Sequence, residues 1–199
     1  MKPVQLALAL SAVSILMTAG ELTSGERQEG VSQLERTRSG VVEATKGLSE
    51  AQWKDKPAPD RWSVAEVLEH IVVSEEALIE GAMKKALETP KVQGDRDVQS
   101  GDKLILKAIP DRSQKFKAPE SMVPTGRWTP QETLARFLKT RSGTIDIMKN
   151  TAELRDHVLD SPLGQPLDAY QWLLFISAHS DRHTKQMLEV KADPGLLKQ

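Results

Sequence analysis

The chain has 199 residues, of which 39% are hydrophobic and 28% charged, a balance typical of a soluble globular protein with one substantial core. Lysine plus arginine (27) nearly equals aspartate plus glutamate (28), and there is no long basic run, which disfavours a nucleic-acid partner. The chain has no cysteine, so disulfides, thiolate metal ligands and a cysteine nucleophile are excluded. Any metal must therefore be held by nitrogen and oxygen. Few aromatic residues and no long alternation of β-branched residues favour helices.

Residues 1–20 resemble a secretory signal peptide. Lys2 precedes an almost uncharged apolar run over residues 4–19, and small residues occupy positions 18–20, where a signal peptidase cleaves. The run is too short for a comfortable membrane span, and the alternative is a short N-terminal helix or anchor. We expect a signal peptide at 1–20 and one domain at 21–199. The protein would be exported, periplasmic or extracellular, if the leader is cleaved, and cytoplasmic otherwise.

The first helix is predicted by apolar residues at helical spacing over residues 25–48. Gly47 is suited to end it, because glycine readily adopts the left-handed conformation that follows many helices. Residues 49–61 form a predicted loop, since Pro57 and Pro59 cannot continue a helix.

The second helix is predicted to begin at a capping box, in which Ser63 and Glu66 satisfy each other's backbone donors. It continues to about Glu88 and stops before Pro90. His70 lies at the edge of its apolar stripe, a position compatible with either a buried ligand or a surface residue.

A long connection of mixed character occupies residues 89–127. It has one short apolar segment at residues 104–109 and is broken by three prolines, Pro110, Pro119 and Pro124. Such a length is unusual between antiparallel neighbours in a bundle. We interpret it as a crossover that lets the third helix lie parallel to the second.

The third helix is predicted from a second capping box, Thr129 with Glu132, and from Pro130 at its first position. It is expected to run to about His157. A histidine near a helix end is more often a solvated residue that interacts with the helix dipole, so His157 is not assigned to a metal site.

The fourth helix is predicted over residues 169–191, with Asp168 as its N-cap after a turn at residues 163–167. Four helices with one long crossover make an all-α four-helix bundle. His179 and His183 lie one turn apart on the apolar face of this helix, so both point into the core and can share one metal ion.

The histidine pair alone is a weak signal, and two ordinary core histidines are the alternative. With His70 as a third ligand, three imidazoles from two helices would leave a coordination position open, which is characteristic of a reactive metal site. A dication held by three neutral imidazoles would favour an anion there, acidify a water molecule or ionise a thiol.

Two segments carry a resemblance to a known family: Trp62-Ser63-Val64-Ala65-Glu66-Val67-Leu68-Glu69-His70 and His179-Ser180-Asp181-Arg182-His183-Thr184-Lys185-Gln186. Together they resemble the DinB-like (DinB/YfiT) superfamily. The resemblance implies an up-down-down-up four-helix bundle, metal ligation by His70, His179 and His183, and zinc or nickel as the metal. As for activity, several members of this family transfer low-molecular-weight thiols to electrophiles, whereas many others have no assigned reaction. The resemblance therefore implies thiol transfer only as one alternative.

Four side chains near the histidines are candidates for supporting roles. Gln186 could orient a ligand or contact substrate, and Trp172 could line the pocket. Arg182 is expected on the flank of the helix, paired with a carboxylate. Glu66 could assist the chemistry, although its capping role is favoured.

The sequence therefore predicts a divalent-metal-dependent enzyme that activates a water molecule or a small thiol for hydrolysis or transfer. The alternative is a non-catalytic metal-binding or ligand-binding bundle. The expected partner is a small-molecule substrate, such as a low-molecular-weight thiol, although an exported protein would find such thiols scarce. Membrane contact is expected only through an uncleaved leader, and a homodimer is an open alternative.

Overall fold

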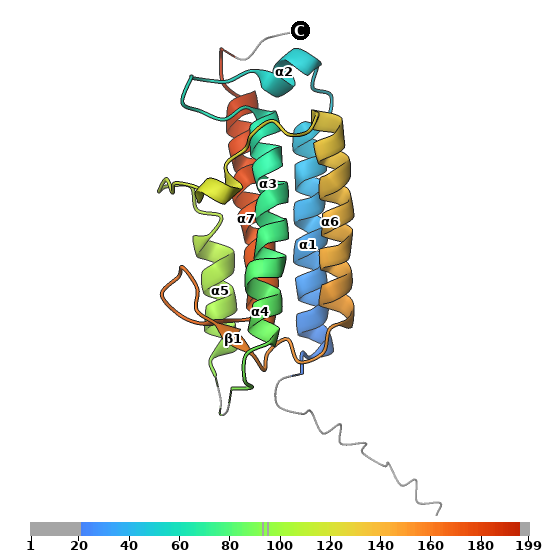
Figure 1. Ribbon diagram of the computed structural model, residues 1–199, viewed down its shortest axis with the longest axis vertical. Helices are drawn as coiled ribbons and strands as arrows, with labels where there is room; N and C mark the ends of the chain where they lie inside the picture. The colour runs from blue at the N-terminus through green and yellow to red at the C-terminus, as the bar shows by residue number, and fades with distance from the viewer. Residues whose placement is uncertain (1–20, 93, 95, 196–199) are drawn as a thin grey trace, which may run out of the picture.

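The computed structural model describes residues 21–92, 94 and 96–195, and the expected leader at 1–20 lies outside this part. Its frame consists of four long helices, α1 (Ser24–Thr45), α3 (Val64–Leu78), α6 (Pro130–Asn150) and α7 (Ala169–Lys191) (Figure 1). Shorter elements connect them: α2 (Glu50–Lys54), the π-helix η1 (Ile79–Met83), α4 (Lys84–Leu87), α5 (Val98–Ala108), the 3-10 helix η2 (Glu120–Met122), β1 (Val158–Leu159) and β2 (Leu167–Asp168). None of the helices in the described part combines the length and apolarity that a membrane span requires.

The four long helices form a bundle in which α1 packs against α6 and α7, and α3 packs against the same two helices. In Figure 1, α1 and α7 run upward while α3 and α6 run downward. Hydrogen bonds agree: Arg27 at the start of α1 donates to the carbonyl of Met148 at the end of α6, at 2.6 Å. Lys191 at the end of α7 donates to the carbonyl of Ala44 at the end of α1, at 3.0 Å. The predicted up-down-down-up bundle is therefore confirmed.

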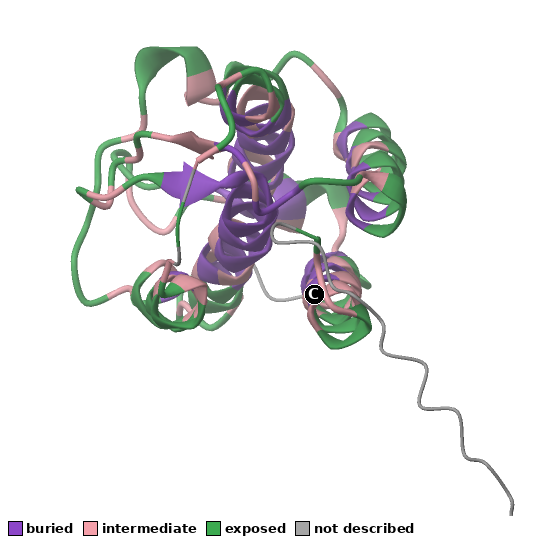
Figure 2. Cartoon of the chain, turned by 90° about the horizontal axis from the view of Figure 1, so that it is seen from below, coloured by how far each residue is buried: buried purple, intermediate pink, exposed green. Residues whose placement is uncertain are grey.

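The connection between α4 and α6, which includes α5 and η2, runs beside the bundle from the end of α4 to the start of α6 (Figure 1). It is more ordered than the sequence analysis indicates, because it contains α5, which packs against α7. Asp97 caps α5 by accepting from the Ser100 backbone N–H at 3.1 Å, and Ile105 is its buried residue. The first half of α7 is consequently covered on all sides, and residues 167–178 are all buried (Figure 2).

The helix starts are set by local hydrogen bonds that the sequence largely reveals. A capping box is present at the predicted starts of α3 and α6, and Asp168 caps α7. Each such cap is worth about 1 kcal/mol. Two further capping boxes, at α1 and α2, were not predicted, and α2 lies within the expected loop at residues 49–61. Gly47 follows α1 with a φ of +73°, as its predicted role at the helix end requires.

The predicted extent of the third helix is wrong. The helix ends at Asn150 because Thr151 turns to an extended conformation, with φ −81° and ψ 129°. His157 instead precedes the short antiparallel pair of β1 and β2. It is not solvated either: the residue is 8% exposed, and its Nδ1 lies in hydrogen-bond contact with the carbonyl of Thr89.

Candidate metal centre

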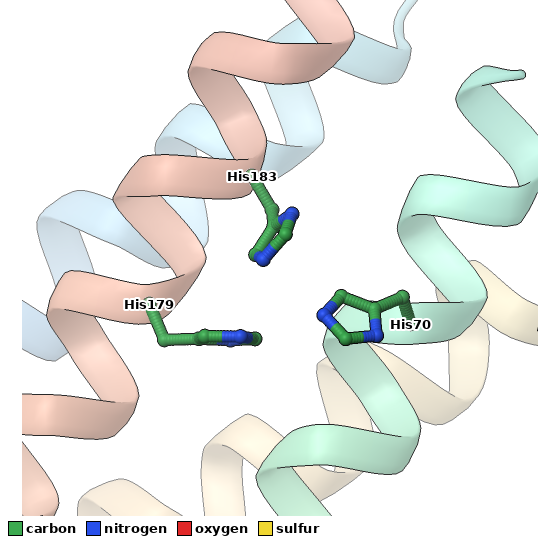
Figure 3. A group of neighbouring side chains, drawn as sticks. All are labelled: His70, His179 and His183. Carbon is green, nitrogen blue, oxygen red and sulfur yellow. The ribbon is translucent and has the colours of Figure 1, made fainter. Parts of the chain in front are cut away.

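Three histidine side chains meet in the interior of the bundle. His70 points from the middle of α3, and His179 and His183 point from α7, so the three rings face one another (Figure 3). The ring of His70 lies 5.1 Å from that of His179 and 4.4 Å from that of His183, centroid to centroid. The two rings on α7 are 4.4 Å apart. One nitrogen from each of the three lies within 4.8 Å of the other two.

His70 is a buried residue, 3% exposed, which resolves the ambiguity of its edge position. Its ring packs against Trp62 at a centroid distance of 4.9 Å, and its Nδ1 lies 2.8 Å from the backbone carbonyl of Met122 in the crossover. A carbonyl oxygen can only accept a hydrogen bond, so Nδ1 carries the proton. Nε2 of His70 therefore keeps its lone pair for a metal.

His183 is oriented in the same manner by a side chain on its own helix. Its Nδ1 lies 2.9 Å from Oε1 of Gln186, one turn further along α7. Since this oxygen is an acceptor, the proton again resides on Nδ1 and Nε2 is left with its lone pair. Oε1 of Gln186 also accepts from Arg112 at 3.5 Å, which ties the amide to the crossover. Gln186 is thus placed to orient the ring of His183, a candidate ligand, which is one of the two roles expected for it.

His179 lies between two aromatic side chains of its own helix, Phe175 and Trp172, and the other two histidines. Its ring stacks at 14° on Phe175, centroid to centroid 6.5 Å, and Phe175 in turn lies 5.5 Å from Trp172. Trp172 is therefore one ring removed from the histidines instead of touching them. No residue in the described ranges hydrogen-bonds the His179 ring, so packing alone orients it.

Burial keeps all three imidazoles in the neutral, metal-binding form. Burial removes water from around the imidazole of His70 and so lowers its pKa, while the hydrogen bond to Met122 opposes this shift. Burial also lowers the pKa of His183 to about 3, with the neighbouring His70 adding to the effect. The pKa of His179 is well below its ordinary value for the same reason, together with the proximity of His183 and His70. Near neutral pH, no proton competes with a cation for these nitrogens.

The donor set fits a divalent transition metal. Tetrahedral zinc binds imidazole nitrogen at about 2.0–2.1 Å, which places the ligand atoms about 3.4 Å from one another. The observed nitrogens, all within 4.8 Å, reach that arrangement by movements of about an ångström, which side-chain rotation can supply. In His70 and His183, the Nδ1 atom is already in hydrogen-bond contact with an oxygen atom. Metal-bound histidines usually have such a contact at the nitrogen that does not bind the metal.

Two other candidates, Glu66 and Arg182, do not join the cluster, and neither does His157, which was not assigned to it. Glu66 serves the capping box, accepting from the Ser63 N–H at 2.8 Å, and pairs with Lys56 at 3.0 Å. Arg182 is mostly buried and donates to backbone carbonyls of the crossover, and no carboxylate in the described part of the chain forms the expected ion pair with it. His157 belongs to the packing of the β1–β2 segment described above.

Several residues around the histidines were missed by the sequence analysis. The carbonyl of Met122 has no side-chain signature, so no pattern could have shown it. Ser74, whose Oγ lies 3.4 Å from Nδ1 of His70, could have been found because it follows His70 by one helical turn. Glu69 is 3% exposed and holds the crossover beside His70, and its place directly before a candidate ligand was the available signal.

Comparisons with known proteins agree with this geometry. The family model of the DinB superfamily matches residues 33–187. An uncharacterized protein of Bacillus subtilis (strain 168), YuaE, is 31% identical over 148 residues, which cover 73% of this chain and 87% of that protein. The solved structure of YfiT from Bacillus subtilis, described as a probable metal-dependent hydrolase with an unusual four-helix bundle topology, has a TM-score of 0.58 at 14% identity. That match covers 93% of this chain and 97% of YfiT. The chain belongs to the DinB superfamily.

Proposed function

We propose that this protein is a divalent-metal-dependent enzyme in which His70, His179 and His183 hold one zinc or nickel ion. The observation that carries the proposal is the convergence of three imidazole rings whose Nδ1 atoms, in His70 and His183, are already occupied by oxygen acceptors. Neutral nitrogen donors without any thiolate suit zinc and nickel.

The chain's own residues would prepare the site in three ways. Met122 and Gln186 fix the ring orientation of two ligands, which removes the rotational freedom that binding would otherwise have to restrict. Trp62 packs against His70 and Phe175 lies near His179, at centroid distances of 4.9 and 6.5 Å, so both apolar side chains would limit the access of water to the rings. Burial keeps the imidazoles neutral, so a bound dication would keep its full charge.

The reaction proposed is hydrolysis, or transfer of a small thiol, on a small-molecule substrate. A divalent ion held by three imidazoles supplies a Lewis acid and lowers the pKa of a water or thiol in its open position. The description of YfiT as a probable metal-dependent hydrolase supports the first reaction. Because the chain has no cysteine, the second reaction would need a thiol cosubstrate.

Metal content, measured on protein purified without an affinity tag and then supplied with zinc or nickel, tests the proposal. We expect about one equivalent in the wild type and a large loss in His70→Ala, His179→Ala and His183→Ala. His157→Ala is the matched control, because it removes the fourth histidine outside the cluster and should leave the stoichiometry unchanged. A wild-type stoichiometry near zero that does not rise on adding either metal would overturn the proposal.

Turnover distinguishes the enzyme from a non-catalytic metal-binding bundle. Hydrolysis and thiol-transfer substrates should be screened with the metal-loaded wild type and with His179→Ala. Activity that His179→Ala abolishes supports the enzyme. Stoichiometric metal binding without turnover on either class of substrate would favour a role in sequestration or stability.

A further inference from the structure

Two consecutive residues of α3, Glu69 and His70, form hydrogen-bond contacts with the backbone of the crossover. His70 contacts the carbonyl of Met122, as described above. The carboxylate of Glu69 reaches the same stretch of crossover three residues later: Oε1 accepts from the Thr125 N–H and Oε2 from the Gly126 N–H, both at 2.9 Å. Residues 122–127 are thus held as a strap across this part of α3.

Both carboxylate oxygens of Glu69 are used in the strap. Oε1 also accepts from Nε of Arg127 at 3.0 Å, and the Thr125 hydroxyl lies 3.3 Å away. Gly126 has a φ of +71°, a left-handed conformation that turns its N–H toward the carboxylate at no steric cost. Glu69 itself is 3% exposed although residues 125–127 of the strap are exposed, so a buried carboxylate holds the exposed end of the strap.

We propose that Glu69 is a positioning residue for His70, an inference that rests on the proposed metal site. The strap is short, so fixing Thr125 and Gly126 also fixes the carbonyl of Met122, which holds the proton of His70 on Nδ1. Glu69 thereby keeps Nε2 of His70 turned toward His179 and His183 without touching the ring. Residues that orient a metal ligand through an outer contact commonly change metal affinity 10- to 100-fold when removed.

Glu69→Gln tests this inference with little change of shape. A glutamine offers one acceptor oxygen where the glutamate offers two, and its amide N–H₂ would face a backbone N–H of the strap. We expect the Met122 carbonyl to lose its fixed position. In the metal-free protein, ¹⁵N NMR of the histidine rings should show a mainly Nδ1–H tautomer for His70 in the wild type and a several-fold larger Nε2–H fraction in the variant. Zinc affinity should fall by about 10-fold.

Two controls separate positioning from stability. Ser63→Ala breaks the capping box at the start of the same helix and lowers the melting temperature, but it does not touch the strap. It should leave the His70 tautomer unchanged. Arg127→Met removes the side-chain contact to Glu69 and leaves the two backbone contacts, so its tautomer shift should be smaller than that of Glu69→Gln.

The readouts also separate this inference from the proposed function. The tautomer is measured without metal, so a shift in Glu69→Gln supports the strap even if the wild type binds no zinc. A wild type that binds zinc, together with a Glu69→Gln variant that keeps both the tautomer and the affinity, would overturn the inference and leave the metal site standing. Equal tautomer shifts in Ser63→Ala and Glu69→Gln would overturn it as well, because loss of stability alone would then explain the effect.

Discussion

Two groups of polar side chains lie next to each other in the core, and they are built in opposite ways. In the first, Arg141 and Glu75 form a fully buried ion pair with contacts of 2.8 and 2.9 Å, and the remaining donors of Arg141 reach Thr37, Ser180 and a backbone carbonyl of α1. The second group is the three histidines. A nitrogen of each ring faces the other two rings, and no acidic side chain in the described part of the chain forms an ion pair with His70, His179 or His183.

The two groups are neighbours along two helices. Glu75 follows His70 by little more than one turn of α3, and Ser180 directly follows His179 on α7. Because Arg141 bonds side chains of α1, α3 and α7 at once, the ion-pair network fixes the register of all four helices. The histidines in turn depend on that register for their approach. Buried polar groups of one core thus differ: those of the Arg141 network are satisfied by one another, whereas each histidine keeps a nitrogen that could bind a ligand.

Among single substitutions, the largest effect is expected from breaking the ion pair. Arg141→Met leaves the Glu75 carboxylate buried, with Thr144 as the one described side chain that still donates to it, so the free energy of unfolding should fall by about 3–5 kcal/mol. Urea denaturation of the metal-free protein measures this loss. The double variant Arg141→Met, Glu75→Leu should recover most of it, because no charge remains buried. A single variant as stable as the wild type would contradict the assignment of the network to fold stability.

A smaller effect is expected when one metal ligand loses its orienting partner. Gln186→Met frees Nδ1 of His183, so zinc affinity should fall about 10- to 100-fold, equivalent to about 1.4–2.8 kcal/mol. Titration calorimetry measures the affinity. Gln165→Met, in the turn between β1 and β2, is a control for the substitution itself and should leave zinc binding unchanged. An unchanged affinity in Gln186→Met would indicate that packing alone orients His183.

The histidine cluster should also make the metal-free protein sensitive to acid. The folded-state pKa of each of these imidazoles lies below the unfolded value of about 6.5, so the unfolded state binds more protons in acid. Their contribution to stability is therefore fully present above about pH 6.5 and is lost as the pH falls toward about 3, the pKa of His183. The slope should be about 1.4 kcal/mol per pH unit for each imidazole that stays neutral.

His183→Gln provides the control for this slope. It should reduce the dependence of the unfolding free energy on pH by about one proton between pH 6 and pH 4. Denaturation in urea at a series of pH values, with a chelator present, gives the measurement. Identical slopes for the wild type and His183→Gln would show that His183 is protonated in the folded protein.

The smallest effect is expected for a ligand replaced by an apolar residue in the absence of metal. His179→Leu removes an imidazole that no described residue hydrogen-bonds, so the unfolding free energy of the metal-free protein should change by less than about 1 kcal/mol or rise. The wild type should gain stability on adding zinc, whereas this variant should not. Thermal melts with and without zinc test both statements. A large loss of stability without metal would assign His179 to the fold.

The sequence revealed those parts of the fold that depend on local contacts. The starts of α3, α6 and α7 follow from capping residues within three positions of one another, and the placement of His179 and His183 follows from one helical turn. The end of α6 could not be predicted in this way, because neither glycine nor proline marks Asn150. His157 is buried and in hydrogen-bond contact with the carbonyl of Thr89, a residue 68 positions away that no local pattern could reveal.

In the candidate site, too, the features that depend on local contacts could be predicted and those that depend on distant residues could not. Its three histidines were identified from helical spacing and a family resemblance, yet the burial of His70 depends on Trp62 and on the return of the crossover. A helical pattern describes only one helix and its own faces, so it assigned His70 to an edge. The contact with Met122 involves a backbone carbonyl, which any residue would supply.

The central claim is that one divalent ion is bound by three imidazoles. X-ray absorption at the zinc edge, on protein loaded with one equivalent of zinc, tests it most directly. We predict a shell that includes three imidazole nitrogens at about 2.0–2.1 Å in the wild type and fewer imidazoles in His70→Ala. A first shell made of oxygen atoms alone, or a wild-type spectrum that His70→Ala does not change, would contradict the account.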